Sequence, residues 1–128
     1  MKEESIKLSS SLEDYLKVIY IHSQKSESVR VTDIAESMSI SKPSVNRAMK
    51  TLMEMGYLKH EHYGDIFLTD IGKDTAKNIL ESYKALYKFL TDVLGVDDET
   101  AAKEADLMEH AISKGTRKKL KKFVKKSK

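Results

Sequence analysis

The sequence predicts a mainly α-helical protein with one small β-hairpin. Two observations lead to this expectation. Over most of the chain the apolar residues recur every three or four positions, which places them on one face of a helix. Between Tyr57 and Leu68 the period changes to two, with a polar turn at residues 62–65, and this pattern is typical of two paired strands.

The organising element is a helix predicted from Ser41 to Gly56. Ser41 is a good N-cap because its hydroxyl can accept a backbone N–H, and Gly56 supplies a left-handed C-terminal stop. The residues expected to face the core recur at i, i+3, i+4 and i+7. They are Val45, Ala48, Met49 and Leu52.

Two further helices and a turn precede it. The first runs from Ser11 to about Ser23, with Ser11 as N-cap and Asp14 completing a variant of the capping box. A polar loop from Gln24 to Arg30 leads to a short helix that ends at Met38, for which Thr32 is the expected cap. A tight turn at residues 39–40 then delivers the chain to the longer helix, and this spacing is that of a DNA-binding helix-turn-helix unit.

The hairpin that follows such a helix corresponds to the wing of a winged helix-turn-helix domain. Arg and Asn can bond two base-edge atoms at once, Lys neutralises phosphate, and a slim helix N-terminus lets N–H groups approach a phosphate. The wing tip is expected to rest on the DNA backbone or in the minor groove. The candidate DNA-binding residues are Thr32, Ser41, Lys42, Pro43, Ser44, Asn46, Arg47, Lys50, His62 and Tyr63. A solvated basic helix face and an exposed turn are the alternatives.

Thr69 is expected to cap a long helix from Asp70 to about Val93, about 36 Å in length. A helix of that length is too long to be used up in covering a domain of about seventy residues, so we expect a DNA-binding domain over residues 1–72 and a helical domain over residues 73–128. A helix starting at residue 98 or 99 and a basic helix capped by Ser113 follow. Two or three helices without a sheet cannot cover all of their apolar side chains. We therefore expect this part to be a dimerisation domain that completes its core against a second copy, giving a homodimer.

Composition limits the function classes. With 128 residues and 40% apolar content, the chain suffices for one domain, or for a small domain plus an extension. The absence of cysteine excludes disulfides, zinc ribbons and thiol catalysis. No apolar run reaches membrane-spanning length and residues 1–11 lack a signal-peptide core, so we expect a cytoplasmic protein without a membrane partner.

The net charge of +3 conceals an asymmetry. Residues 114–128 hold nine of the 23 basic residues and none of the 20 acidic ones, which leaves residues 1–113 with a net charge of −6. Such a cationic end can add a salt-dependent attraction to nucleic acid. A solvated helix or a frayed tail is the commoner explanation, and both remain open.

Asp106, Glu109 and His110 are spaced at i, i+3 and i+4, so all three project from one face of a helix and can hold one ion. By spacing alone, a solvated acidic surface is the commoner explanation.

Several short motifs, in order along the chain, resemble those of the metal-dependent repressors typified by the diphtheria toxin repressor and the manganese transport regulator. The motifs are residues 11–20, 31–36, 41–58, 68–72, 95–97 and 109–110. The resemblance implies a homodimeric winged-helix repressor that binds a double-stranded DNA operator when Mn(II) or Fe(II) lies between the first helix and the dimerisation helices. The chain corresponds to the shorter, manganese-type architecture.

Carried over by position, one metal site is complete. Its ligands are Asp14, Asp106, Glu109 and His110. The family's second site is broken, because Lys17 and Tyr83 replace a Glu and a His, and the ancillary positions hold Tyr83, Tyr87 and Ala102. We therefore expect one metal ion per protomer. Lys17 either takes the place of the lost second cation or is solvated.

Three rival functions remain at this stage. The chain can be a winged-helix regulator that is metal-independent or senses another ligand, a small metal-dependent hydrolase, or a structural helical module. Against an enzyme, the sequence contains no glycine-rich substrate loop and no evident general base other than the metal ligands themselves. Against a purely structural module, such a role would leave the basic face of the helix from Ser41 to Gly56 unexplained.

Overall fold

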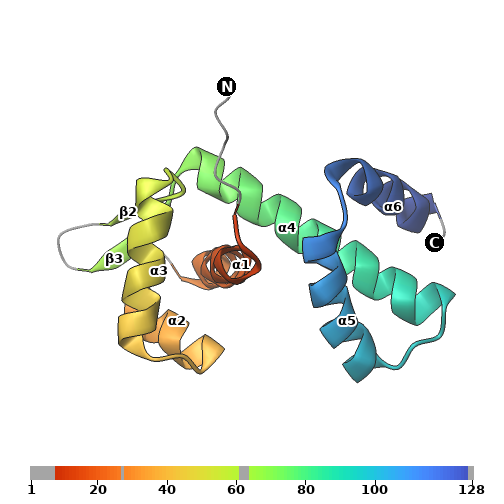
Figure 1. Cartoon of the computed structure of the whole chain (residues 1–128), viewed down its shortest axis with the longest axis horizontal. Helices are drawn as coiled ribbons and strands as arrows, with labels where there is room; N and C mark the ends of the chain where they lie inside the picture. The colour runs from red at the N-terminus through yellow and green to blue at the C-terminus, as the bar shows by residue number, and fades with distance from the viewer. Residues whose placement is uncertain (1–7, 27, 61–63, 127–128) are drawn as a thin grey trace. The chain divides into compact units, whose positions relative to one another are not determined.

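The computed structural model describes residues 8–26, 28–60 and 64–126. It divides into two compact units, Met1–Lys77 and Asn78–Lys128, and the division falls inside the long helix α4 (Figure 1). Each unit is described by itself. The boundary expected from the sequence, between residues 72 and 73, stays a prediction.

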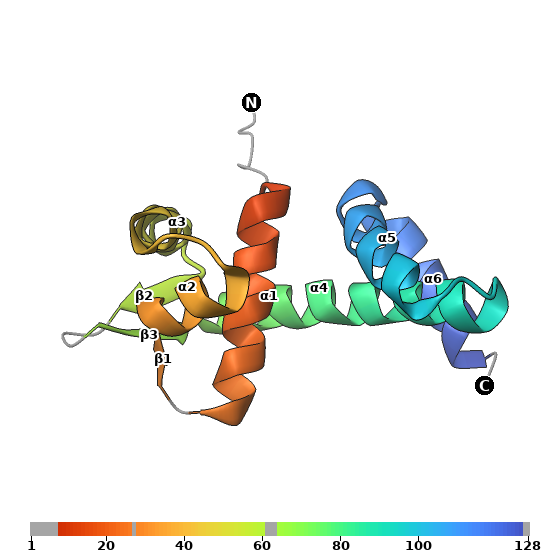
Figure 2. The same cartoon turned by 90° about the horizontal axis from the view of Figure 1, so that it is seen from below.

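The N-terminal unit combines helices with a small antiparallel sheet, as predicted. Its elements are α1 (Ser10–Lys25), β1 (Val29–Arg30), α2 (Val31–Met38), α3 (Lys42–Glu54), β2 (Leu58–His60), β3 (Asp65–Leu68) and the start of α4 (Asp70–Lys88). The predicted hairpin is confirmed, with Leu58 opposite Leu68. The third strand was missed: β1 lies in the predicted loop and pairs with β3, giving the order β1-β3-β2 (Figure 2). Two residues are too few to show an alternating pattern.

The core of this unit is built mainly from large apolar side chains of α1, α2, α3 and the three strands. All four residues expected on the inner face of α3 are buried, which confirms that stripe. They pack with buried residues of the other elements. These include Leu16 and Ile19 of α1, Val29 of β1, Ile34 of α2, Leu58 of β2 and Ile66 of β3.

The ends of α3 are fixed by local contacts. The Ser44 N–H donates to Ser41 Oγ at 3.3 Å, so the predicted N-cap is confirmed. At the other end Gly56 has φ +88°, its N–H donates to the Met53 carbonyl, and the Tyr57 N–H donates to the Leu52 carbonyl. This pair of bonds is a Schellman motif, which satisfies the last carbonyls of the helix.

Two predicted caps were wrong. Helix α1 is capped by Ser9, whose Oγ accepts the Leu12 N–H at 3.1 Å, and not by Ser11. A run of three serines offers three caps, and the helix extends back to the first. Helix α2 begins at Val31, with Arg30 and not Thr32 at the N-cap position. The Asp33 carboxylate stabilises this start by accepting the Arg30 N–H at 3.0 Å.

The C-terminal unit contains the rest of α4, a π-helical turn η1 (Phe89–Val93), α5 (Asp98–Ala111) and α6 (Lys114–Lys126). Thr69 caps α4 as predicted, with its Oγ1 accepting the Gly72 N–H at 3.0 Å. Ser113 caps α6, accepting the Thr116 N–H at 3.1 Å. One buried apolar cluster of this unit consists of Leu86, Leu90, Ala101 and Ala105. In the described part of the chain, no helix has both the length and the apolar content needed to cross a membrane.

Candidate DNA-binding face and metal-ligand cluster

The turn between α2 and α3 sets the direction of α3. Ser39 adopts the left-handed conformation with φ +55°, which costs an L-residue about 1 kcal/mol. The strain is offset locally, because the following N–H, that of Ile40, donates to the Ala35 carbonyl at 3.1 Å. The result is the helix-turn-helix arrangement predicted from the spacing of the two helices (Figure 1).

The outer face of α3 carries the predicted recognition residues. Ser44 is half-buried and the other candidates of α3 and its cap are exposed, as is Thr32 on α2. Arg47 donates from Nη2 to Ser44 Oγ at 3.2 Å, which holds the guanidinium along the helix surface near its N-terminus. A planar guanidinium, an amide and two ammonium groups on one exposed helix face can contact base edges and phosphates together. His62 and Tyr63 lie outside the described residues.

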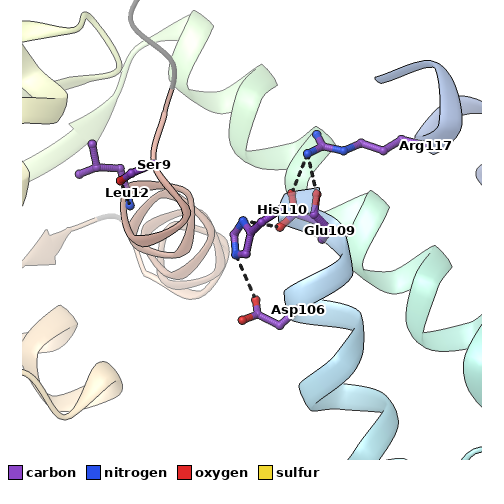
Figure 3. A network of polar contacts seen from close by, with 6 residues as sticks. All are labelled: Ser9, Leu12, Asp106, Glu109, His110 and Arg117. Carbon is purple, nitrogen blue, oxygen red and sulfur yellow. Dashed lines mark hydrogen bonds and ion pairs between the residues drawn. The ribbon is translucent and has the colours of Figure 1, made fainter. Parts of the chain in front are cut away.

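On α5 the structure brings Asp106, Glu109 and His110 together (Figure 3). The two ring nitrogens of His110 face one carboxylate each: Nε2 lies 3.7 Å from Asp106 Oδ1, and Nδ1 lies 3.3 Å from Glu109 Oε1. One ion binds an imidazole through a single nitrogen, so the two contacts show that each carboxylate lies beside the ring and not that all three groups surround one ion. Two carboxylates and an imidazole are nevertheless the donor types that Mn(II) and Fe(II) take.

Glu109 is the unusual member of this cluster, because it is fully buried within α5. Arg117, from the first turn of α6, lies beside it: Nη2 is 3.3 Å from Glu109 Oε2 and donates to the Glu109 carbonyl at 2.7 Å (Figure 3). Arg117 was not among the candidate residues predicted from the sequence. Its one signal was that it is the single arginine among the basic residues of 114–128.

The positions of the family's second site hold no comparable set of donors. The rings of Tyr83 and Tyr87 stack at 6.3 Å between centroids and pack against the core of the C-terminal unit. A hydrogen bond to the Asp98 carboxylate raises the pKa of the Tyr87 hydroxyl, which keeps this phenol protonated. Ala102 offers no side-chain donor.

Asp14 and Lys17 both lie on α1 in the N-terminal unit, where each is half-buried. Asp106, Glu109 and His110 belong to the C-terminal unit. The assignment of Asp14 as a fourth ligand thus stays a prediction.

Comparison with known proteins gives a consistent result. The family model described as "Iron dependent repressor, N-terminal DNA binding domain" matches residues 7–66. The model described as "Iron dependent repressor, metal binding and dimerisation domain" matches residues 69–128. Together the two models account for most of the chain.

Individual relatives agree with these matches. An uncharacterized helix-turn-helix-type transcriptional regulator of Methanocaldococcus jannaschii is 37% identical over 122 residues, which are 94% of this chain and 98% of the relative. The transcriptional regulator MntR of Bacillus subtilis is 33% identical over 80% of this chain and 72% of its own length. The solved structure of the manganese regulator SloR superimposes with a TM-score of 0.79 at 30% identity, over 89% of this chain. The chain spans about half of that structure, 53% of its length.

Proposed function

The chain belongs to the family of iron-dependent repressors, with a DNA-binding domain and a metal-binding and dimerisation domain, and we propose that it is a homodimeric regulator of transcription controlled by Mn(II) or Fe(II). The family is one of DNA-binding regulators, and no enzymatic role is proposed. Repression of metal-uptake genes, in the cytoplasm where the operator lies, is the expected physiological role.

The observation that carries the proposal is the donor cluster on α5. Asp106 and Glu109 each place a carboxylate oxygen within 4 Å of a ring nitrogen of His110, in the domain whose family model describes metal binding. Two carboxylates and an imidazole suit octahedral Mn(II) or Fe(II), with water at the remaining positions, better than they suit tetrahedral zinc. The likeness to the manganese regulator SloR favours Mn(II).

Asp14 is the fourth proposed ligand. Because Asp14 belongs to the first helix and the other ligands to α5, an ion bound by all four ties the DNA-binding domain to the dimerisation domain. The two recognition helices of a dimer must match half-sites about 34 Å apart, or a multiple of that distance. If the metal ion binds more tightly to the arrangement that matches the half-sites, it shifts the population of dimers toward that arrangement. The size of the shift is set by the difference in metal affinity between the two arrangements.

A binding experiment with a pool of random duplex DNA, with Mn(II) and with chelator, tests this function. Arg47→Ala is expected to weaken DNA binding roughly tenfold or more in both conditions, because a bidentate base contact contributes about 1–3 kcal/mol. Lys73→Ala, which removes an exposed positive charge from α4 of the same unit, is the matched control. Equal DNA binding by wild type and Arg47→Ala would contradict the assignment of α3.

The metal part of the function has its own variant. His110→Ala is expected to abolish the increase in DNA affinity caused by Mn(II) while leaving binding in chelator unchanged, since His110 lies on α5 and not on the recognition helix. If chelation leaves wild-type affinity unchanged, the chain is instead the metal-independent winged-helix regulator considered above.

We further propose one ion per protomer, because the second family site has Lys17 and Tyr83 in place of two ligands. A calorimetric titration with Mn(II) is expected to give a stoichiometry of one for the wild type. The double variant Lys17→Glu/Tyr83→His is expected to approach two, because it restores a carboxylate and an imidazole. A stoichiometry of two in the wild type would refute the single-site proposal.

A further inference from the structure

Arg117 connects α6 to the proposed metal ligands of α5. We propose that it is a positioning residue, a built-in cation that keeps Glu109 in place in the metal-free protein, so that metal acts as a reversible switch and is not needed for folding. This inference rests on the proposed function, since it concerns a ligand of the proposed ion.

The contact is specific in its geometry. One guanidinium nitrogen, Nη2 of Arg117, reaches both the carbonyl oxygen of Glu109 at 2.7 Å and its carboxylate oxygen Oε2 at 3.3 Å. The Ser113 cap fixes where α6 begins, and the Arg117 N–H donates to the Ser113 carbonyl at 2.9 Å. The side chain is thus anchored at its base and at its tip.

Burial makes the contact consequential. The Glu109 side chain is 0% exposed and that of Arg117 is 17% exposed. A buried carboxylate without a compensating charge is strongly unfavourable, and arginine is the side chain whose charge is permanent. Arg117 therefore compensates Glu109 whether or not a metal ion is bound.

The same contact orients the two carboxylate oxygens. Oε2 faces Arg117, and Oε1 faces the imidazole of His110 at 3.3 Å. One oxygen of Glu109 is therefore held on the ligand side and the other is engaged by α6. Many small metal domains are unfolded without their metal, because the free energy of metal binding is part of their folding free energy. In this chain Arg117 removes that dependence.

When Arg117 is removed, a bound metal ion should become the main positive charge that compensates Glu109. Arg117→Met keeps the length and apolar stem of the side chain but loses the charge, so metal-free Glu109 is left buried without that counter-charge. A divalent ion next to Glu109 can restore it, and it no longer meets the repulsion of the guanidinium. The variant is thus expected to be less stable without metal and more strongly stabilised by metal.

The test is thermal unfolding of the full chain, measured in chelator and in saturating MnCl2. Arg117→Met is expected to lower the metal-free Tm by about 10 °C, whereas Lys118→Met, an equal loss of charge at the next, exposed position, changes it by about 2 °C or less. Mn(II) should raise the Tm of Arg117→Met by clearly more than that of wild type. The metal-free Tm of Arg117→Lys should fall between those of Arg117→Met and wild type, because an ammonium keeps the charge but is more strongly hydrated than a guanidinium and so costs more to bury.

Two results would overturn the inference. One is equal metal-free Tm values for Arg117→Met and Lys118→Met. The other is an Mn(II)-induced rise in Tm that is the same in Arg117→Met and wild type.

A Glu109→Gln background separates this inference from the proposed function. With no carboxylate charge to compensate, Arg117→Met should cost far less metal-free stability than it does in wild type, and an equal cost would refute the ion-pair argument. If Mn(II) fails to raise the Tm of wild type, the proposed function and the switching role fail together. The metal-free comparison still decides whether Arg117 stabilises Glu109.

Discussion

The two units bury their apolar residues to very different degrees. The N-terminal unit closes a core rich in leucine, isoleucine, valine and methionine around its sheet, and the large apolar side chains exposed in its described part are Ile21 and Ile71. The small core of the C-terminal unit is half alanine and lies beside a buried glutamate. Among the described residues, this unit exposes Val93, Leu94, Leu107 and Phe123.

This difference fits the part that each unit plays. The described part of the N-terminal unit covers most of its large apolar side chains, which suits a domain that presents one rigid helix to a DNA groove. The C-terminal unit leaves apolar surface uncovered, as expected of a domain that gains cover from a second copy. Its match to a dimerisation domain agrees with that interpretation.

The largest expected effect comes from adding a side chain at Gly72, where the backbone of the N-terminal unit is closely packed. A Cβ at Gly72 would overlap with the carbonyl oxygen of Tyr57, which cannot withdraw easily because it accepts the Thr69 N–H at 3.1 Å. Gly72→Ala is therefore expected to destabilise the N-terminal unit by about 3 kcal/mol. Hydrogen exchange should show the loss of protection in α3.

Gly115→Ala is the matched control in the C-terminal unit. A Cβ there meets only Ser113 Oγ at 3.8 Å, and alanine favours the helix, so this change should stabilise by about 0.5 kcal/mol. Equal effects of the two substitutions would mean that the N-terminal unit is not as closely packed as described.

The next effect concerns the exposed apolar residues. Leu107 of α5 and Ile71 of α4 are each 65% exposed, one in each unit. Leu107→Lys is expected to raise the dissociation constant of the dimer roughly tenfold to a hundredfold. The substitution removes an apolar side chain that the dimer would bury and puts a charge in its place. Ile71→Lys should leave the dimer unchanged. Sedimentation velocity over a concentration series measures both, and an unaffected dimer in Leu107→Lys would place the interface elsewhere.

The same contrast explains what could be predicted from the sequence. Helix α3 was predicted with its cap, its stop and its buried stripe because Ser41 and Gly56 act on neighbouring backbone groups. The cluster on α5 follows from helical spacing alone. Strand β1 could not be predicted, since its two residues become a strand only by pairing with β3.

Tertiary contacts account for what the sequence missed at the candidate site. Arg117 resembles its lysine neighbours in sequence, and only the packing of α6 against α5 distinguishes it. The burial of Glu109 was likewise invisible, because periodicity places Asp106 and Glu109 on the same face without saying which is covered. The roles of Asp14, His62 and Tyr63 stay predictions.

The smallest expected effect concerns one helix cap of the C-terminal unit. Ser9, Ser41 and Ser113 cap α1, α3 and α6 with hydroxyls, whereas Asp97 caps α5 with a carboxylate that accepts the Thr100 N–H at 3.1 Å. This bond lowers the pKa of Asp97 below its ordinary value of 3.8. The stabilisation by Asp97 is therefore fully present above about pH 4 and is lost as the pH falls through the lowered pKa.

Asp97→Asn should leave the stability of the C-terminal unit near its wild-type value at pH 7, because asparagine caps a helix about as well as aspartate. It should also reduce the acid-induced loss of protection in α5 amides below pH 4, because an amide does not titrate. Asp97→Ala, which lacks the cap, should be less stable at every pH. Hydrogen exchange at pH 3 to 7 measures this, and an acid sensitivity of α5 that is identical in wild type and Asp97→Asn would assign the sensitivity to another group.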